Sequence, residues 1–190
     1  RAVFLYGALL ATLIPIVQSA LSLLDRLALQ MVGLSASQAI IGPNQSWSDN
    51  LIAIGMNAIA AAYFVTVLRA DWQVIATKDS FTDIRRIYRH VWLIYSLGFV
   101  VAAVQQLLWF ILNAFPSVLS FPYRANGAHG IALILIGLPL WYFSWKTLQD
   151  ALAGHAERES LLRLGVLYLL ALAGVTTVLG AGGVLIDVIL

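Results

Sequence analysis

The sequence predicts an all-α integral membrane protein, a bundle of five transmembrane helices built from tandem two-helix repeats. Of the 190 residues, 61% are hydrophobic and 11% are charged, whereas an ordinary soluble domain is about 25% charged. The mean hydropathy is +0.89, and a soluble chain of this length cannot bury so much apolar surface. The apolar runs are continuous rather than alternating, so they predict helices and not the strands of a membrane barrel.

The first two predicted helices are apolar runs of the length that a bilayer requires, roughly 20 residues at about 1.5 Å per residue. The first covers residues 2–29, and the breaker residues Gly42-Pro43-Asn44-Gln45-Ser46 follow it. The second covers residues 51–71 and leads into a short charged connection from Thr77 to Arg86. Breakers and charges at these points favour helix ends.

The other three predicted helices cover residues 90–114, 130–149 and 164–189. Between the third and the fourth lie the turn signals Pro116, Pro122 and Asn126-Gly127. The connection from Gly154 to Arg163 is short and charged. The run from Ile131 to Lys146 is the clearest single membrane signal, because it is apolar until it ends in aromatic residues and one lysine.

The basic residues predict the orientation of the chain. With this threading, nine of the 11 Lys and Arg residues lie at one face, and only Arg26 and Arg124 fall at the other. Such asymmetry in short loops marks the cytoplasmic side, so the start of the first helix is predicted inside and the end of the fifth outside. The anchors predicted for the cytoplasmic face are Arg85, Arg86, Arg89, Lys146, Arg158 and Arg163.

The chain also repeats itself in the order A-B-A-B-A, with a period of about 80 residues. The segment Arg1–Tyr6 resembles Arg163–Tyr168, and Tyr63-Phe64 matches Tyr142-Phe143. The predicted repeats are 1–85, 86–162 and an incomplete 163–190 within a single membrane domain, 1–190. Because the chain opens on Arg1 rather than Met, further residues are expected before it.

The last third of the chain carries a family resemblance. Residues 135–146 read Leu-Ile-Gly-Leu-Pro-Leu-Trp-Tyr-Phe-Ser-Trp-Lys, and Glu157-Arg158-Glu159-Ser160-Leu-Leu-Arg163 precedes the last apolar helix. This stretch resembles the bacterial membrane domain DUF5671, which shows a Gly-Leu-Pro-x-Trp run followed by a Glu-Arg-x-Ser-x-x-Arg loop. The earlier copy lacks the Gly-Leu-Pro-x-Trp element and has Ala58 to Ala62 instead. The resemblance implies a multi-span protein of the bacterial inner (plasma) membrane, and it implies no catalytic residue.

Polar residues inside apolar helices are the candidate ligand site. They are Gln18, Asn57, Gln105 and Gln106. Gln18, Ser22 and Asp25 share one face of the first helix, at spacings of four and three residues. Such residues line an outward-facing polar cavity or make interhelical hydrogen bonds worth about 0.6–2 kcal/mol each, and the sequence leaves both interpretations open.

No pattern in the sequence predicts an enzyme, a metal site or a cofactor. There is no cysteine, and no Gly-rich nucleotide loop or metalloprotease motif occurs. His90 is expected at the inner start of the third helix, His129 at the outer start of the fourth and His155 in the inner loop. No two share a helical spacing of three or four residues, and only His90 and His155 are close enough in this threading to share a metal or haem, so interfacial side chains are the favoured interpretation. The net charge of only +2, with no basic stripe interleaved with aromatic residues, argues against nucleic acid.

These observations favour a non-enzymatic membrane protein, an accessory or scaffold subunit of a larger bacterial membrane complex. Its expected partners are the lipid bilayer and other membrane subunits, and a homo-oligomer is left open. The alternative is a small-molecule channel, carrier or sensor with an outward-facing polar cavity.

Overall fold

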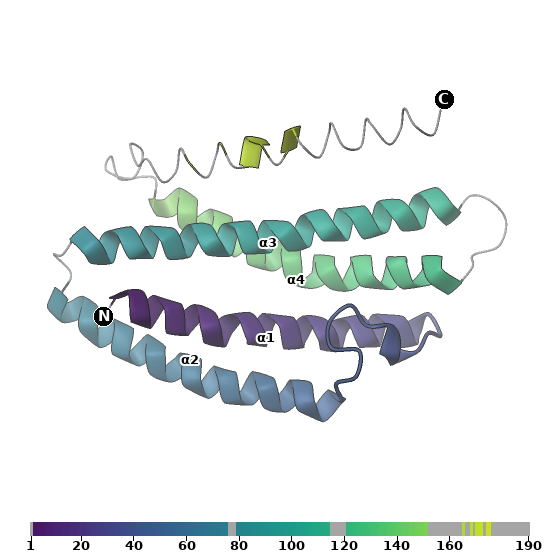
Figure 1. Cartoon of the computed structure of the whole chain (residues 1–190), viewed down its shortest axis with the longest axis horizontal. Helices are drawn as coiled ribbons and strands as arrows, with labels where there is room; N and C mark the ends of the chain where they lie inside the picture. Colours follow the sequence, from purple (N-terminus) through teal and green to yellow (C-terminus); the bar gives the residue numbers. More distant parts are fainter. Residues whose placement is uncertain are drawn as a thin grey trace. The chain divides into compact units, whose positions relative to one another are not determined.

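The structure is a computed structural model that describes residues 2–75, 79–114 and 121–151, and residues 165, 168, 170–172, 174 and 175. Its elements are α1 (Ala2–Met31), the short 3-10 helix η1 (Ala36–Gln38), α2 (Trp47–Ile75), α3 (Asp79–Ala114) and α4 (Phe121–Ala151) (Figure 1). The chain divides into two units, Arg1–Lys146 and Thr147–Leu190. The first unit therefore holds α1, α2, α3 and most of α4.

The all-α prediction is confirmed in the described part of the chain, where every regular element is helical. Four helices there are long and apolar enough to cross a membrane: Ala2–Met31, Trp47–Trp72, Asp83–Ile111 and Tyr123–Ala151. Most of the fifth predicted helix, 164–189, lies outside the described residues, and those described within it are helical. The tandem repeats stay a prediction.

The end of α1 is fixed by a glycine in the left-handed conformation. Gly33 has a φ of 76°, its N–H donates to the carbonyl of Gln30 at 3.0 Å, and the N–H of Leu34 donates to that of Leu29 at 2.9 Å. This pair of bonds is a Schellman motif. The accompanying apolar contact is present too, because Leu29 and Leu34 belong to one buried cluster.

The start of α2 is fixed by a capping box, four residues before the predicted start. The N–H of Asp49 donates to Ser46 Oγ at 3.1 Å, and the N–H of Ser46 donates to Asp49 Oδ2 at 2.7 Å. Each side chain thus satisfies a backbone donor that the first turn leaves open. Hydropathy alone predicts that the helix begins at residue 51, because the first turn of α2 is polar.

Both α3 and α4 begin earlier than predicted, at Asp79 and Phe121 rather than at about 90 and 130. Hydropathy marks only the part of a helix that lies in hydrocarbon, and a helix can continue beyond it. The dipeptide Asn126-Gly127 was predicted to be a turn, and it lies inside α4. Gly127 allows the ring of Phe110 in α3 to pack closely against α4, because a Cβ atom at this position would lie 3.0 Å from that ring.

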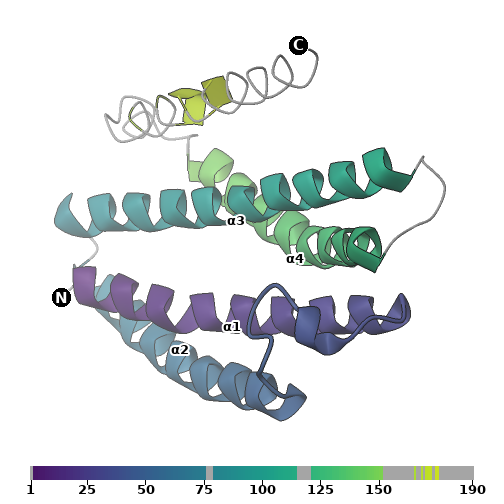
Figure 2. The ribbon, with the colours of Figure 1, turned by 45° about the vertical axis from the view of Figure 1, so that its right-hand side comes forward.

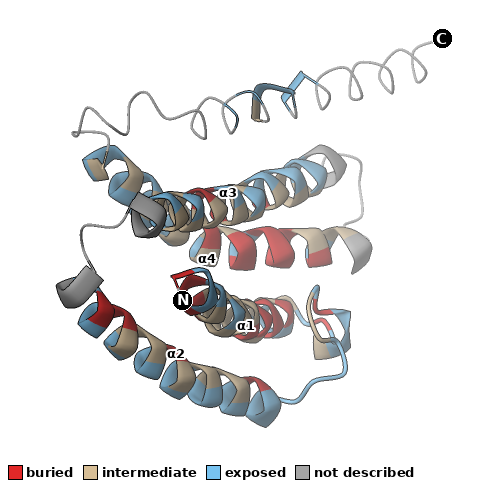
Figure 3. Cartoon of the chain, turned by 60° about the vertical axis from the view of Figure 1, so that its left-hand side comes forward, coloured by how far each residue is buried: buried red, intermediate tan, exposed pale blue. Residues whose placement is uncertain are grey.

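The core of the first unit forms around α1, which buries residues against α2, α3 and α4 (Figures 2 and 3). Near the α1–α2 loop, Leu29 packs with Ala125 and Ala128 of α4. In the middle of the bundle, Leu21 packs with Ala103 and Ala132. At the opposite end, the buried cluster is Leu5, Tyr6, Leu9 and Leu68. By contrast, many residues of α2 are exposed (Figure 3).

Two glycines let α4 approach α3 closely. A Cβ atom at Gly130 would lie 2.7 Å from the side chain of Leu107, and one at Gly137 would lie 2.9 Å from Cβ of Phe99. At Gly137 the backbone of α3 is also near, with Phe99 C and Val100 N both 3.3 Å away. Backbone cannot turn aside as a side chain can, so a larger residue at Gly137 would push α3 and α4 apart.

Candidate functional site

Three polar side chains lie on one face of α1 near its end. Ser22, Asp25 and Arg26 are three and four residues apart, which brings them together on a helix. All three are buried, with Ser22 and Asp25 fully inaccessible. Buried ionisable groups inside a spanning helix are costly unless they are paired, and for this reason they indicate function.

These side chains hold the backbone of the α1–α2 loop. Asp25 Oδ2 accepts from the N–H of Ile40 at 2.8 Å, Ser22 Oγ donates to the carbonyl of Ile41 at 3.0 Å, and Arg26 donates to the carbonyl of Gly42. Three consecutive loop residues are therefore bound by one helix face. Irregular backbone at the edge of a bilayer requires such partners, because lipid supplies none.

The second oxygen of Asp25 binds a residue of α4. Asp25 Oδ1 lies 2.6 Å from His129 Nδ1, and the two side chains are 1% and 11% exposed. A carboxylate accepts hydrogen bonds, so with Asp25 in that form Nδ1 of His129 is the donor of this contact. The aspartate thereby fixes the orientation of the ring and leaves Nε2 as the histidine's remaining nitrogen.

Asn50 of α2 completes the arrangement. Its Nδ2 donates to Ser22 Oγ at 3.4 Å and to the carbonyl of Ser46 at 3.2 Å. We refer to Ser22, Asp25, Arg26, Asn50 and His129 as the polar cluster. Within this cluster, Asn50 Oδ1 and Arg26 Nε are buried without a hydrogen-bond partner among the described residues. Most buried polar groups are satisfied, so these two atoms are exceptions.

The chemistry that the geometry of the polar cluster shows is hydrogen bonding, including one carboxyl–imidazole contact. Within the described ranges, no group of three or more His, Cys, Asp or Glu side chains is placed to hold a metal ion. His90, at the other end of the bundle, has its Nδ1 2.8 Å from the carbonyl of Arg86, one turn back in α3.

The four amides predicted to form a ligand site lie apart from the polar cluster. Gln18 is half-buried and lies close to the Tyr95 hydroxyl. That hydroxyl is buried and has no hydrogen-bond partner among the described residues. Asn57 donates to the carbonyl of Ala53 in its own helix at 2.8 Å. Gln105 is exposed and Gln106 is half-buried, both in α3. A cavity lined by these amides stays a prediction.

The predicted cytoplasmic anchors that are described lie at the end of the helices opposite the α1–α2 loop. Arg85, Arg86 and Arg89 are in the first turns of α3, and Lys146 is near the end of α4. The Arg85 guanidinium lies 5.0 Å from the ring centre of Trp72, and Arg86 Nη1 lies 3.0 Å from Asp83. Arg158 and Arg163 lie outside the described residues.

The sequence argument missed His129 and Asn50 as members of the polar cluster. Asn50 was assigned to the loop before α2, although Ser46 with Asp49 three residues later was a readable helix start. The Asn126-Gly127 turn signal predicts that the fourth helix begins near residue 130, and such a start would place His129 at the membrane interface. With α4 beginning at Phe121, His129 lies two turns inside the helix and reaches Asp25.

Comparison with known proteins gives one family. The model described as "Domain of unknown function (DUF5671)" matches residues 86–190, more than half of the chain. No curated protein and no solved structure matches the chain. The matched range includes His129 but neither Asp25 nor Asn50, so the polar cluster joins the matched part to the part before it. With this match over α3, α4 and the residues that follow, the chain belongs to the DUF5671 family.

Proposed function

We propose that this protein is a non-enzymatic accessory or scaffold subunit that docks against other membrane helices in a larger bacterial membrane complex. The observation that carries the proposal is the outer face of α2. Gly55, Ala58 and Ala62 are exposed there, although they are small residues of the kind that helix contacts use.

The exposed face of α2 carries both small and large apolar residues. Large apolar side chains flank the small ones, among them Leu51 and Ile59, the latter 74% exposed. Gly55, Ala58 and Ala62 follow one another at spacings of three and four residues, so they form a stripe along one side of the helix. In lipid, small residues at such spacing let a second helix approach closely and gain van der Waals contact. The opposite side of α2 is used inside the bundle, where Leu68 packs with α1.

Replacing Ala58 with leucine tests this docking face. If a partner helix packs on the stripe, the larger side chain weakens the contact by about 1–3 kcal/mol, which is roughly 5- to 150-fold in affinity. The measurement is gentle detergent extraction from native membranes, followed by mass spectrometry of the co-purifying membrane subunits. Ala11→Leu is the matched control, because Ala11 is an exposed alanine of α1. Recovery of the wild-type protein alone would refute the scaffold function.

The proposal includes a topology in the bacterial inner membrane, with the start of α1 in the cytoplasm and the end of the fifth helix outside. The basic residues support it, since Arg85, Arg86, Arg89 and Lys146 gather at one end of the helices. At the other end, Arg26 is buried against the Gly42 carbonyl, which leaves Arg124 as the exposed cation of that end among the described residues. Excess positive charge marks the cytoplasmic side.

Because the chain has no cysteine, single cysteines can report this topology. We expect Gln38→Cys, in the α1–α2 loop, to react with a membrane-impermeant maleimide in intact spheroplasts. Asp150→Cys, near the end of α4, is expected to react only after the membrane is permeabilised. Both positions are exposed, so differences in burial do not explain a difference in labelling. The reverse labelling pattern would invert the proposed orientation.

The polar cluster favours a second candidate function, a small-molecule carrier or sensor. Its support is the buried Asp25–His129 pair, together with the unpaired atoms Asn50 Oδ1 and Arg26 Nε. Ionisable side chains inside spanning helices are typical of transport and sensing sites. Recovery of the protein without other subunits, together with a small polar molecule that raises its melting temperature by binding the folded state, would favour this candidate over the scaffold.

A further inference from the structure

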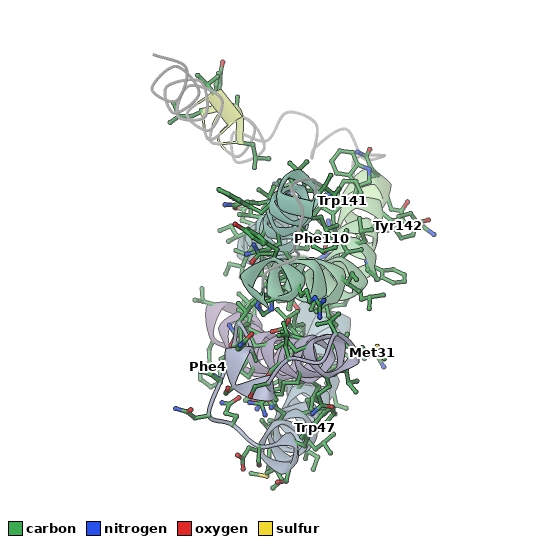
Figure 4. All side chains as sticks on the ribbon, turned by 90° about the vertical axis from the view of Figure 1, so that its right-hand side faces the viewer. Phe4, Met31, Trp47, Phe110, Trp141 and Tyr142 are labelled. Atoms are coloured by element: carbon green, nitrogen blue, oxygen red, sulfur yellow. The ribbon has the colours of Figure 1, made fainter. Side chains whose placement is uncertain are left out.

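An apolar cleft of about 420 Å³ lies beside the polar cluster, where α1, α3 and α4 come together. Its walls include Met31 at the end of α1, Leu107 and Phe110 of α3, and Ile131 of α4 (Met31 and Phe110 are labelled in Figure 4). Met31 and Ile131 are themselves exposed, so the cleft opens to the surroundings of the helices. Its volume is within the range of about 300–1,000 Å³ that small-molecule sites occupy.

One cation lines this cleft. Arg124 lies in the first turn of α4 and is exposed. No acidic residue lines the cleft in the described part of the chain. Arginine matches phosphate groups well because its planar guanidinium presents parallel N–H donors to two oxygens. The cleft therefore combines an apolar lining with one positive charge, which favours an anionic ligand.

The order of these groups along α4 matches the order of groups in a lipid. Arg124 precedes Ile131 by seven residues, which is about 10 Å along a helix. The cation lies at the helix end, where a bilayer meets water, and the apolar lining lies deeper. A free phosphate would gain nothing from the apolar walls, whereas a phospholipid fills the cleft with an acyl chain and places its phosphate at the rim.

We infer that this cleft binds an anionic glycerophospholipid, with the acyl chain against Met31, Leu107 and Ile131 and the headgroup phosphate on Arg124. Charge complementarity and the depth of the apolar lining carry the inference. The lipid is a component of the surrounding bilayer, and its binding is independent of whether α2 docks a partner.

The experiment uses the purified full chain in detergent and native mass spectrometry. Phosphatidylglycerol and phosphatidylcholine with identical acyl chains are titrated separately, and the bound fraction gives the dissociation constant of each. Phosphatidylglycerol is expected to bind at least tenfold more tightly. Arg124→Gln is expected to weaken phosphatidylglycerol about tenfold, since a hydrogen bond to a charged group is lost. Phosphatidylcholine is expected to weaken less, because its choline cation already offsets the attraction between its phosphate and Arg124. Ile131→Trp, which fills the cleft from an exposed position, is expected to weaken both lipids.

Two matched variants keep the test specific. Arg69→Gln removes the same charge from an exposed position on α2, and Leu135→Trp adds the same bulk one turn further along α4. Neither residue lines the cleft, so neither variant is expected to change lipid binding. Equal affinity for the two lipids, or an equal loss in Arg69→Gln, would overturn the inference. Competition by glycerol phosphate as strong as that by the lipid would do the same, because it would show a headgroup site without an acyl groove.

Discussion

Replacing Asp25 with alanine is expected to lower the free energy of unfolding by about 2–6 kcal/mol, because two buried donors each lose their acceptor at a cost of about 1–3 kcal/mol. The carboxylate serves two elements at once, since Oδ1 binds His129 of α4 and Oδ2 binds the N–H of Ile40 in the loop. Its removal leaves both donors buried without an acceptor. The measurement is reversible unfolding in mixed detergent micelles, followed by helical circular dichroism.

Two further variants make the Asp25 result interpretable. Asp25→Asn keeps an oxygen that can accept from Ile40, so its loss should be smaller than that of the alanine variant. Asp150→Ala removes an exposed carboxylate from α4 and should change stability by no more than about 0.5 kcal/mol. If Asp25→Ala and Asp150→Ala were equally mild, the polar cluster would not hold the loop and α4 to α1.

Replacing Gly137 with leucine is expected to destabilise the protein by about 1–3 kcal/mol, the range for inserting methylene groups into a well-packed core. Even the first carbon would lie 2.9 Å from Phe99 Cβ and 3.3 Å from the backbone of α3. Leucine has the better intrinsic helix propensity by somewhat under 1 kcal/mol, so overpacking outweighs this gain. The same unfolding experiment gives the difference.

Gly98 provides the control for Gly137. It is exposed on α3, and no atom lies within 4 Å of a Cβ built there. Gly98→Leu therefore gains helix propensity without a clash, and the variant is expected to be as stable as the wild type or more stable. A Gly137→Leu protein as stable as the Gly98→Leu protein would mean that α3 and α4 do not approach as closely as the structure has them.

The helices were predictable because length and hydropathy are local properties of a segment. Their ends were less predictable, since these depend on single backbone and side-chain hydrogen bonds. The capping box of Ser46 and Asp49 begins α2, and the left-handed Gly33 ends α1. Both signals are present in the sequence, but a hydropathy window averages over them.

The candidate site was predictable only in part. Helical spacing placed Ser22 and Asp25 on one face of the first helix, and both lie in the polar cluster. The pairing of Asp25 with His129 spans 104 residues, and neither residue's neighbours in the sequence indicate it. Such a pair follows from the packing of α4 against α1 through Ala125, Ala128 and Ala132, which a single sequence does not reveal.

The long separation of Asp25 and His129 has a consequence for how the chain is made. During synthesis α1, the loop and α2 enter the membrane first, and Ser22, Arg26 and Asn50 can already find their partners within this hairpin. Asp25 Oδ1 cannot, because His129 is still to be translated. The nascent hairpin therefore holds a half-satisfied carboxylate at the edge of the bilayer until α4 arrives. Insertion of α4 supplies His129, so this contact forms only in a chain that has been synthesised through α4.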